Sequence, residues 1–292
     1  MRVDAHHHLW DLDVRDQPWT RDLPALRRSF GLDDLRPSLR RHGVDGIVLV
    51  QTITVPEETP EFLELAHTEP EVLGVVGWVD LTGLAVGVGG GEASTVAGDL
   101  HRLRALPGGD RLVGIRHQVQ EEPDPRWLVR PDVVAGLREV ERAGLVYDLL
   151  VKPHQLEAAV EVTGTLPGLR FVLDHAGKPD IANARLDPWR DAIRRLAERP
   201  NVACKLSGLV TEAAPDWTVD DLRPFADHVL ACFGPDRVMA GSDWPVCLLA
   251  GAYDDVVAAT DELLAGLDDA GRAAVLGGTA VRWYGLASRV TP

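Results

Sequence analysis

The amino-acid sequence predicts a (β/α)8 barrel that occupies residues 1–292 as a single domain. Short apolar runs of the kind that form buried strands alternate with amphipathic stretches along the whole chain. Apolar strands separated by helices form a parallel sheet that is covered on both faces. Eight such units close into a barrel, and a chain of 292 residues is within the length that single barrels reach.

The eight predicted strands are short, mostly apolar runs that are rich in valine and leucine. They cover residues 2–6, 46–52, 73–80, 112–119, 145–151, 170–175, 201–207 and 237–242. Each run is bounded by polar residues or by glycine and proline, which are typical of strand ends.

Helices are predicted between these strands from start and stop signals. The helix at 33–41 ends before Gly43, and the helix at 131–142 begins with a proline and ends before Gly144. The remaining helices are expected at 57–67, 93–106, 154–163, 188–198, 219–232 and 253–264. Every helix thus falls between two strands or after the last one, as the barrel requires.

Composition and charge exclude several classes of protein. The chain is 45% hydrophobic and 26% charged, which is typical of a globular protein. Its net charge of -15 disfavours binding to nucleic acid or to an anionic membrane, so a small-molecule substrate is expected. There is no secretory signal pattern and no apolar run long enough to cross a membrane. The sequence therefore predicts a cytoplasmic protein.

Two further features are predicted to have no catalytic role. The glycine-rich segment 87–91 lacks the GxxxxGK[ST] pattern of a phosphate-binding loop, and we expect a flexible loop there. The three cysteines, Cys204, Cys232 and Cys247, have neither the number nor the spacing of a disulfide framework or a zinc ribbon. They are expected to be small buried side chains.

Three histidines at positions 6–8 end the first predicted strand. Strand side chains alternate between faces, so His6 and His8 should point one way and His7 the other. Two imidazoles in this arrangement can bind one divalent metal ion or bracket a substrate. A structural histidine cluster remains the alternative, because a His-x-His pair alone is a weak motif.

Barrel closure brings further candidates to the same place, because active sites in this fold lie at the carboxyl ends of the strands. Asp243 ends the eighth strand, which neighbours the first, so it should lie beside His6 and His8. A carboxylate there is a metal ligand or a general base, and a capping or turn role is the alternative. The chain has only three lysines, and all of them lie at the predicted mouth: Lys152, Lys178 and Lys205. A functional role would explain this placement, because an arginine does not replace the compact charge of a lysine. The alternative is that they are ordinary surface lysines.

These residues together resemble the amidohydrolase superfamily, specifically the amidohydrolase-2 branch and its sugar-lactone hydrolases of the L-fuconolactonase and L-rhamnonolactonase kind. The resemblance covers nearly the whole chain. It rests on six segments: DAHHHLW at 4–10, GIRHQV at 114–119, YDLL at 147–150, LDHAGKP at 173–179, CKLSGLVTE at 204–212 and GPDRVMAGSDWPV at 234–246.

The resemblance implies a distorted (β/α)8 barrel with a catalytic centre at His6, His8, His175 and Asp243. Two-metal members of the superfamily use a lysine from the fourth strand, but this chain has Arg116, His117 and Gln118 there. A two-metal site is therefore disfavoured. One divalent ion held by His6, His8 and Asp243, most simply zinc, or a metal-independent enzyme, is implied instead.

The implied chemistry is hydrolysis of a sugar-acid lactone such as an L-fucono- or L-rhamnonolactone. Asp243 would act as the general base toward water. Arg116, His117 or a metal would polarise the carbonyl group, and His175 or protonated Asp243 would protonate the leaving oxygen. Asp174 is expected on the face opposite to His175, so it should not orient that imidazole.

Substrate contacts are expected from residues at the rim. Trp10, Trp78 and Trp244 could stack on a sugar ring, although tryptophans are as often part of the core. Lys152 and Lys205 could bind hydroxyl or carboxylate groups.

The sequence leaves two other functions open. The same branch contains metal-dependent decarboxylases of aromatic or unsaturated acids. The second is a barrel that only binds a sugar acid or a metal, because a fold alone does not determine function.

Overall fold

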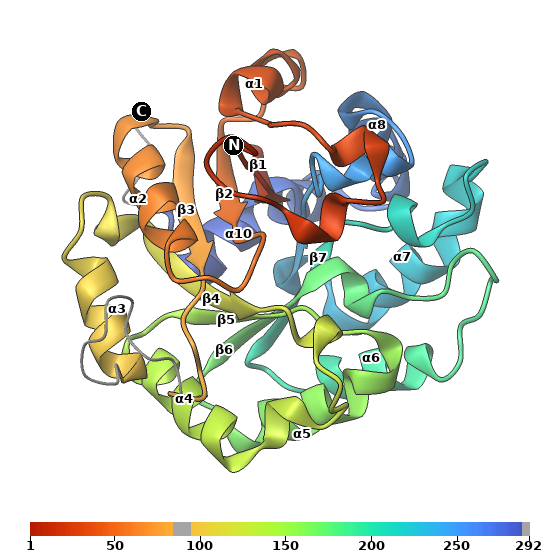
Figure 1. Cartoon of the computed structure of the whole chain (residues 1–292). Helices are drawn as coiled ribbons and strands as arrows, with labels where there is room; N and C mark the ends of the chain where they lie inside the picture. The colour runs from red at the N-terminus through yellow and green to blue at the C-terminus, as the bar shows by residue number, and fades with distance from the viewer. Residues whose placement is uncertain (84–94, 288–292) are drawn as a thin grey trace.

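Eight parallel strands form a nearly closed barrel in the computed structural model, which describes residues 1–83 and 95–287 (Figure 1). Each strand pairs in parallel with the next one along the chain. The strands are β1 (Val3–His7), β2 (Gly46–Val50), β3 (Val72–Gly77), β4 (Leu112–His117), β5 (Val146–Leu149), β6 (Arg170–Leu173), β7 (Val202–Leu206) and β8 (Val238–Ala240). The predicted barrel is confirmed, and most strands end one to three residues earlier than expected because the chain turns into the mouth.

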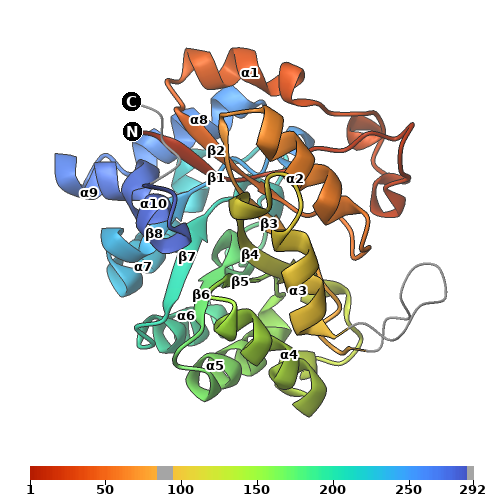
Figure 2. The ribbon, with the colours of Figure 1, turned by 90° about the vertical axis from the view of Figure 1, so that its left-hand side faces the viewer.

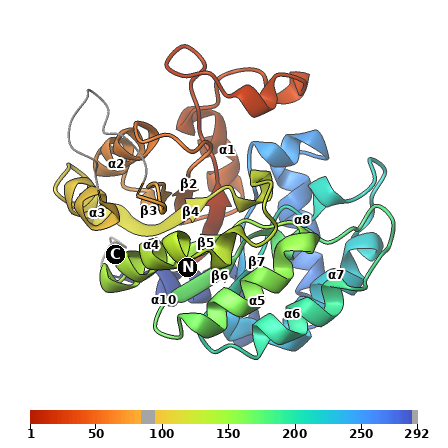
Figure 3. The same cartoon turned by 60° about the horizontal axis from the view of Figure 1, so that its bottom comes forward.

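Helices surround the strands on the outside of the barrel (Figures 1 and 3). They are α1 (Leu32–Arg41), α2 (Glu58–Thr68), α3 (Val96–Arg104), α4 (Pro131–Arg142), α5 (Leu156–Thr165), α6 (Trp189–Ala197), α7 (Val219–Phe233) and α8 (Tyr253–Leu263). Figure 3 shows α4, α5 and α6 following one another along the outside of β5 to β7. The glycine-rich segment 87–91 and the first two residues of the predicted helix 93–106 lie outside the described residues. Within the described part of the chain, no helix combines the length and hydrophobicity needed to cross a membrane.

Two short helices that the sequence did not predict, α9 (Asp269–Ala273) and α10 (Thr279–Tyr284), follow the last barrel helix. Figure 2 shows both on the side of the molecule where the N-terminus lies. Side chains of the α10 region pack against the apolar interior of the barrel, which includes Val48, Val146 and Met239. This end of the barrel is therefore filled by hydrophobic side chains.

The seam between β1 and β8 differs from the other strand contacts. The two strands share no ladder, and an isolated bridge joins His7 to Trp244. The His8 amide donates to the Trp244 carbonyl at 2.6 Å, and the Asp243 amide donates to the His6 carbonyl at 2.8 Å. Barrel closure thus places residues 6–8 directly beside residues 243–244, as expected.

Candidate active site

A β-bulge in β1 aims His6 into the barrel. Asp4 pairs with Ile47 and His7 with Leu49, so three steps along β1 match two along β2. The extra residue lets Ala5 and His6 both face the interior, where Ala5 packs with the apolar layer. His7 points away, and its Nδ1 lies 2.9 Å from the Val48 carbonyl oxygen.

Four side chains from three strand ends meet above the apolar layer. Nε2 of His6 lies 3.1 Å from Nε2 of His8, and Oδ1 of Asp243 lies 3.7 Å and 3.4 Å from these two atoms. Nε2 of His175 lies 4.0 Å from the same carboxylate oxygen, and the His6 and His175 rings are 4.4 Å apart. The structure therefore brings together the four residues that the resemblance implied.

Nε2 of His6, Nε2 of His8 and Oδ1 of Asp243 are spaced so that they could bind a single divalent ion. Tetrahedral zinc with bonds of about 2.0–2.1 Å places its ligand atoms roughly 3.3 Å apart, close to the separations observed. Nδ1 of His8 lies 2.8 Å from the Val50 carbonyl oxygen, so it carries the proton and leaves Nε2 free to bind metal. A second close group contains His6, Asp174 and His175, but Lys205 and Arg116 already pair with that aspartate. One ion is therefore favoured over two.

A left-handed turn after β6 directs His175 into the barrel. β6 ends at Leu173, and His175 and Ala176 have φ values of 52° and 51°. Asp174 keeps the inward direction that strand alternation gives it, and the turn swings His175 to the same side. The expectation that these residues face opposite ways is therefore wrong, because the strand does not continue through both.

His175 is oriented by Ser207 rather than by an aspartate. Its Nδ1 lies 3.0 Å from the Ser207 hydroxyl oxygen. Gly208 permits this approach, since its φ is 62° and a Cβ there would lie 2.5 Å from the same nitrogen. Burial lowers the pKa of His175 to about 4, despite the neighbouring Asp243. This imidazole is neutral at neutral pH.

Asp243 is a buried carboxylate that stays ionised. Burial alone would raise its pKa, but His175, His8 and Lys178 outweigh that effect, so the pKa lies below the usual 3.8. Its φ of 59° is left-handed, a conformation that Asp and Asn tolerate better than most residues. An ionised carboxylate at this position can accept a proton from water.

A layer of buried charges lies directly beneath this cluster. The Lys205 ammonium contacts Asp148 at 2.6 Å, Asp174 at 2.9 Å and Nδ1 of His6 at 3.1 Å. Arg116 donates to Asp174 at 3.0 Å and also to the backbone carbonyl of Gln51. Two cations thus offset two buried carboxylates, and of these four residues Arg116 also reaches the cavity.

Lys205 itself has no exposed surface, so a substrate in the cavity cannot reach its ammonium. The predicted substrate-binding role of Lys205 does not match this position. Burial raises the pKa of Asp148 to about 6, even though Lys205 opposes the shift. Two donors from Tyr284 and Lys205 hold that carboxylate in place.

A cavity of about 430 Å³ opens above the four-residue cluster. Its volume is in the range of small-molecule sites. It is lined by His8, Trp19, Thr52, Arg116, Gln118, Gln120, Glu121, Leu150, His175, Lys178, Asp243 and Val246. Most of these side chains are polar, which suits a ligand with many hydroxyl groups.

Several residues predicted at the site do not line this cavity. Trp10 and Trp244 are buried around Phe30, and Nε1 of Trp10 donates to the Arg28 carbonyl oxygen. Trp78 donates to Nδ1 of His117 at 3.0 Å instead. Trp10 and Trp244 thus pack in the core, the alternative that the sequence left open, whereas Trp78 is half-buried against His117.

His117 and Lys152 are also not among the residues that line the cavity. Nε2 of His117 contacts Glu122 at 2.7 Å, and its ring stacks on Trp127. Both nitrogens of His117 are therefore engaged, so a catalytic role does not match its position. The Lys152 ammonium lies 3.6 Å from the carboxylate of Glu121, which does line the cavity. Of the three lysines, Lys178 is the one that lines the cavity.

Trp19 and Lys178 are lining residues that the predicted site set did not contain. Trp19 belongs to the long segment between β1 and α1, where periodicity gives no indication of position. Lys178 follows the His175 turn and has a φ of 52°, and its ammonium contacts Glu212 at 2.8 Å. The sequence placed Lys178 at the predicted mouth with the other two lysines, but substrate contacts were assigned to Lys152 and Lys205 instead.

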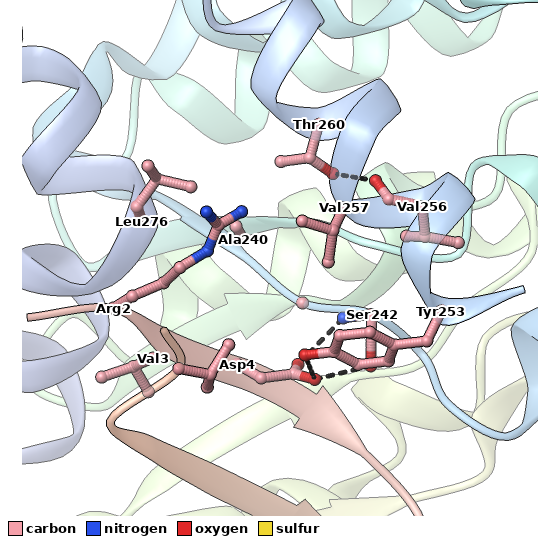
Figure 4. A pocket seen from close by; sticks show the side chains of 12 residues that line it. Arg2, Val3, Asp4, Ala240, Ser242, Tyr253, Val256, Val257, Thr260 and Leu276 are labelled. Atoms are coloured by element: carbon pink, nitrogen blue, oxygen red, sulfur yellow. Dashed lines mark hydrogen bonds between the residues drawn. The ribbon is translucent and has the colours of Figure 1, made fainter. Parts of the chain in front are cut away.

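Asp4 links the ends of β1 and β8, which carry the candidate metal ligands His6, His8 and Asp243. Figure 4 shows its contacts with Ser242 and Tyr253. Its carboxylate accepts hydrogen bonds from the His6 amide at 3.2 Å, the Ser242 amide at 2.9 Å and the Ser242 hydroxyl at 2.6 Å. The Tyr253 hydroxyl donates from α8 at 3.2 Å. The group sits outside the barrel wall, so it supports His6 and Asp243 from behind.

Replacing Asp4 by alanine should lower the free energy of unfolding by about 2–3 kcal/mol, because two buried amides lose their acceptor. Tyr253→Phe should cost about 1 kcal/mol, since it removes one donor only. Urea unfolding of both variants measures these values. Equal losses in the two variants would contradict the proposed importance of the amide contacts.

The buried histidine at position 7 should make stability fall in acid. Burial lowers the pKa of His7 to about 3, against 6.5 when unfolded, so the unfolded chain binds the extra proton. Stability from this group is complete above pH 6.5 and is lost as pH falls, by about 2 kcal/mol between pH 7 and pH 5. His7→Asn keeps an N–H toward Val48 but cannot be protonated. The urea midpoint of unfolding should therefore depend less on pH in this variant than in the wild type. An unchanged dependence would show that protonation of His7 does not cause the loss of stability in acid.

Comparison with known proteins agrees with this geometry. The model of the amidohydrolase family matches residues 3–286. The chain is 38% identical to an L-fucono-1,5-lactonase of Burkholderia ambifaria, over 97% of this chain and 95% of that protein. An L-fucono-1,5-lactonase of Burkholderia multivorans is also 38% identical, with 98% and 96% covered.

A solved structure shares the fold closely. The crystal structure of an amidohydrolase from Burkholderia multivorans with bound zinc superposes with a TM-score of 0.87 at 37% identity, covering 98% of this chain and 99% of that one. The family match extends over nearly all of the chain, and the resemblance inferred from the six sequence segments is confirmed. The chain belongs to the amidohydrolase family.

Proposed function

We propose that this chain hydrolyses the cyclic ester of a sugar-acid lactone, with an L-fucono-1,5-lactone as the first substrate to test. The observation that carries the proposal is the ionised Asp243 beside His8 and His175 at the floor of a polar cavity. The lactonase relatives at 38% identity over nearly the full chain support the same reaction.

Asp243 is proposed as the general base. Its carboxylate accepts a proton from a water molecule while the water oxygen bonds to the lactone carbonyl carbon. The ring C–O bond then breaks, and the ring oxygen takes up a proton. Because burial holds His175 neutral, protonated Asp243 is the better acid for this second step. The product acid ionises at neutral pH and releases one proton per lactone.

Arg116 is proposed to stabilise the negative charge that develops on the carbonyl oxygen. It lines the cavity, and its guanidinium is fixed by Asp174 and Gln51. A donor held in place before the reaction needs no reorganisation as charge develops. Replacement of Arg116 by lysine would lose this fixed arrangement, because an ammonium cannot bind both partners in the same plane.

His6, His8 and Asp243 would hold one divalent ion, as the spacing of their ligand atoms permits. A bound ion would lower the pKa of water and polarise the carbonyl group. The Burkholderia multivorans amidohydrolase contains zinc, which supports zinc as the ion to test.

The purified chain should therefore contain about one zinc ion per molecule. His8→Ala should lower the zinc content measured by elemental analysis, whereas His67→Ala on the exposed face of α2 should not. Treatment with a chelator should remove the ion and most of the lactonase activity, and added zinc should restore both. A stripped chain that keeps its full rate would contradict an obligatory metal.

The reaction is tested with a panel of aldonolactones and aromatic acids. A pH indicator follows acid release from lactones, and ultraviolet absorbance follows loss of the aromatic acids. The proposal predicts acid release from at least one 1,5-lactone and no change with the aromatic acids. Loss of aromatic absorbance alone would indicate a decarboxylase, and no reaction with either class would leave only a binding function.

A further inference from the structure

Trp19 presents an exposed indole inside the cavity that holds Asp243. About 36% of its surface is exposed, which is unusual for the largest apolar side chain. It lines the same cavity as His8, His175 and Asp243. Trp19 belongs to the turn Pro18–Thr20, which follows β1.

A chain of oriented hydrogen bonds fixes this indole. Nε1 of Trp19 donates to Oε1 of Gln17 at 2.9 Å, and Nε2 of Gln17 donates to the Thr52 hydroxyl at 2.8 Å. The Thr52 hydroxyl donates in turn to Glu58, whose other oxygen accepts from the Thr52 amide at 2.8 Å. Each link has one direction only, so the Gln17 amide cannot flip without losing two bonds.

The surroundings of Gln17 restrict the turn further. Its side chain is almost fully buried, and its backbone carbonyl accepts from the Thr20 hydroxyl at 2.8 Å and from Arg27 at 3.2 Å. The Trp10 ring meets the Trp19 ring edge to face at 5.4 Å. These contacts hold the Trp19 indole in one orientation. The side chain therefore loses little conformational entropy when a ligand covers it.

We propose that Trp19 is the sugar-binding platform of this site, on which the C–H face of the lactone ring stacks. An indole offers a flat apolar surface to such a face. The other walls of the cavity carry groups that hydrogen-bond hydroxyls, including Gln118, Gln120 and Lys178. One apolar surface among polar walls suits a ring with C–H groups on one face and hydroxyls around its edge. This inference rests on the proposed lactonase function.

Trp19→Ala should raise KM for the lactone about 5- to 10-fold and change kcat less than about twofold, because stacking holds the substrate without taking part in bond making. The KM of Trp19→Phe should lie between those of the wild type and Trp19→Ala. Gln17→Leu keeps the indole but removes its anchor, so KM should rise less than in Trp19→Ala. A loss of kcat alone, with KM unchanged, would overturn the platform role.

Fluorescence gives a second readout that does not need turnover. The aldonate product, added to the zinc-loaded chain, should quench or shift the tryptophan emission of the wild type, and Trp19→Phe should abolish the change. Trp283→Phe is the matched control, because Trp283 lies in α10 at the other end of the barrel. Its change should equal that of the wild type. A signal that persists in Trp19→Phe would refute the inference.

The two proposals fail in different ways. If the wild type hydrolyses no lactone, the lactonase function fails, whatever the Trp19 variants do. If the wild type hydrolyses lactone with the same KM as Trp19→Ala, only the platform is refuted.

Discussion

Replacing Asp243 by asparagine is expected to lower kcat for lactone hydrolysis about 10²- to 10⁴-fold, because the variant cannot accept the proton of the attacking water. The carboxylate is ionised at neutral pH, and it lies within 4.0 Å of both His8 and His175. Asparagine has nearly the same size, and it tolerates the left-handed backbone at this position. The fold should therefore survive the change.

The measurement is the rate of proton release at saturating lactone, with circular dichroism to confirm the fold. Asp180→Asn is the matched control, since Asp180 lies near the same rim but contacts Asn183 and Arg185 rather than the cavity. It should keep the wild-type rate. A folded, metal-loaded Asp243→Asn chain with wild-type kcat would remove Asp243 from the mechanism.

The second large effect concerns stability. Lys205→Met should lower the free energy of unfolding by about 3–5 kcal/mol at pH 8, because it leaves buried carboxylates without their shared cation. Lys205 contacts both Asp148 and Asp174 and has no exposed surface. Lys152→Met is the control, since Lys152 forms a partly exposed pair, and it should change stability by less than about 1 kcal/mol.

The loss in Lys205→Met should shrink as the pH falls. Burial already raises the pKa of Asp148 to about 6, and loss of the lysine charge should raise it further. A carboxyl whose folded pKa exceeds its unfolded value near 3.8 binds more protons when folded, so it favours the folded state at low pH. Urea unfolding at pH 5.5 and pH 8 measures this difference. A loss that is independent of pH would contradict the predicted protonation of Asp148.

The sequence was sufficient for the fold because strands and helices follow local hydrophobic patterns. Eight apolar runs are enough to predict the barrel, and barrel closure is enough to place Asp243 beside His6 and His8. The residues that close the seam between β1 and β8 were harder to predict from the sequence. Asp4 acts through contacts with Ser242 and Tyr253, which are distant from it in the chain.

Alternation predicted side-chain direction at the strand ends only in part: His6 and His8 face the same way and His7 the other, as expected, but other pairs do not follow it. A bulge turns Ala5 and His6 to the same side, and a left-handed turn does so for Asp174 and His175. Neither irregularity has a clear sequence signal. Lys205 shows the same limit, since a lysine at a strand end suggested the cavity, whereas the structure places it in the closed layer below.

The central claim is that the cavity above Asp243 opens sugar-acid lactones. The most direct measurement is proton release by the purified, zinc-loaded wild-type chain with L-fucono-1,5-lactone, compared with spontaneous hydrolysis in the same buffer. We expect one proton per lactone, at a rate proportional to enzyme concentration and far above the spontaneous rate. A rate equal to the spontaneous one for this and other aldono-1,5-lactones, from a folded chain, would contradict it.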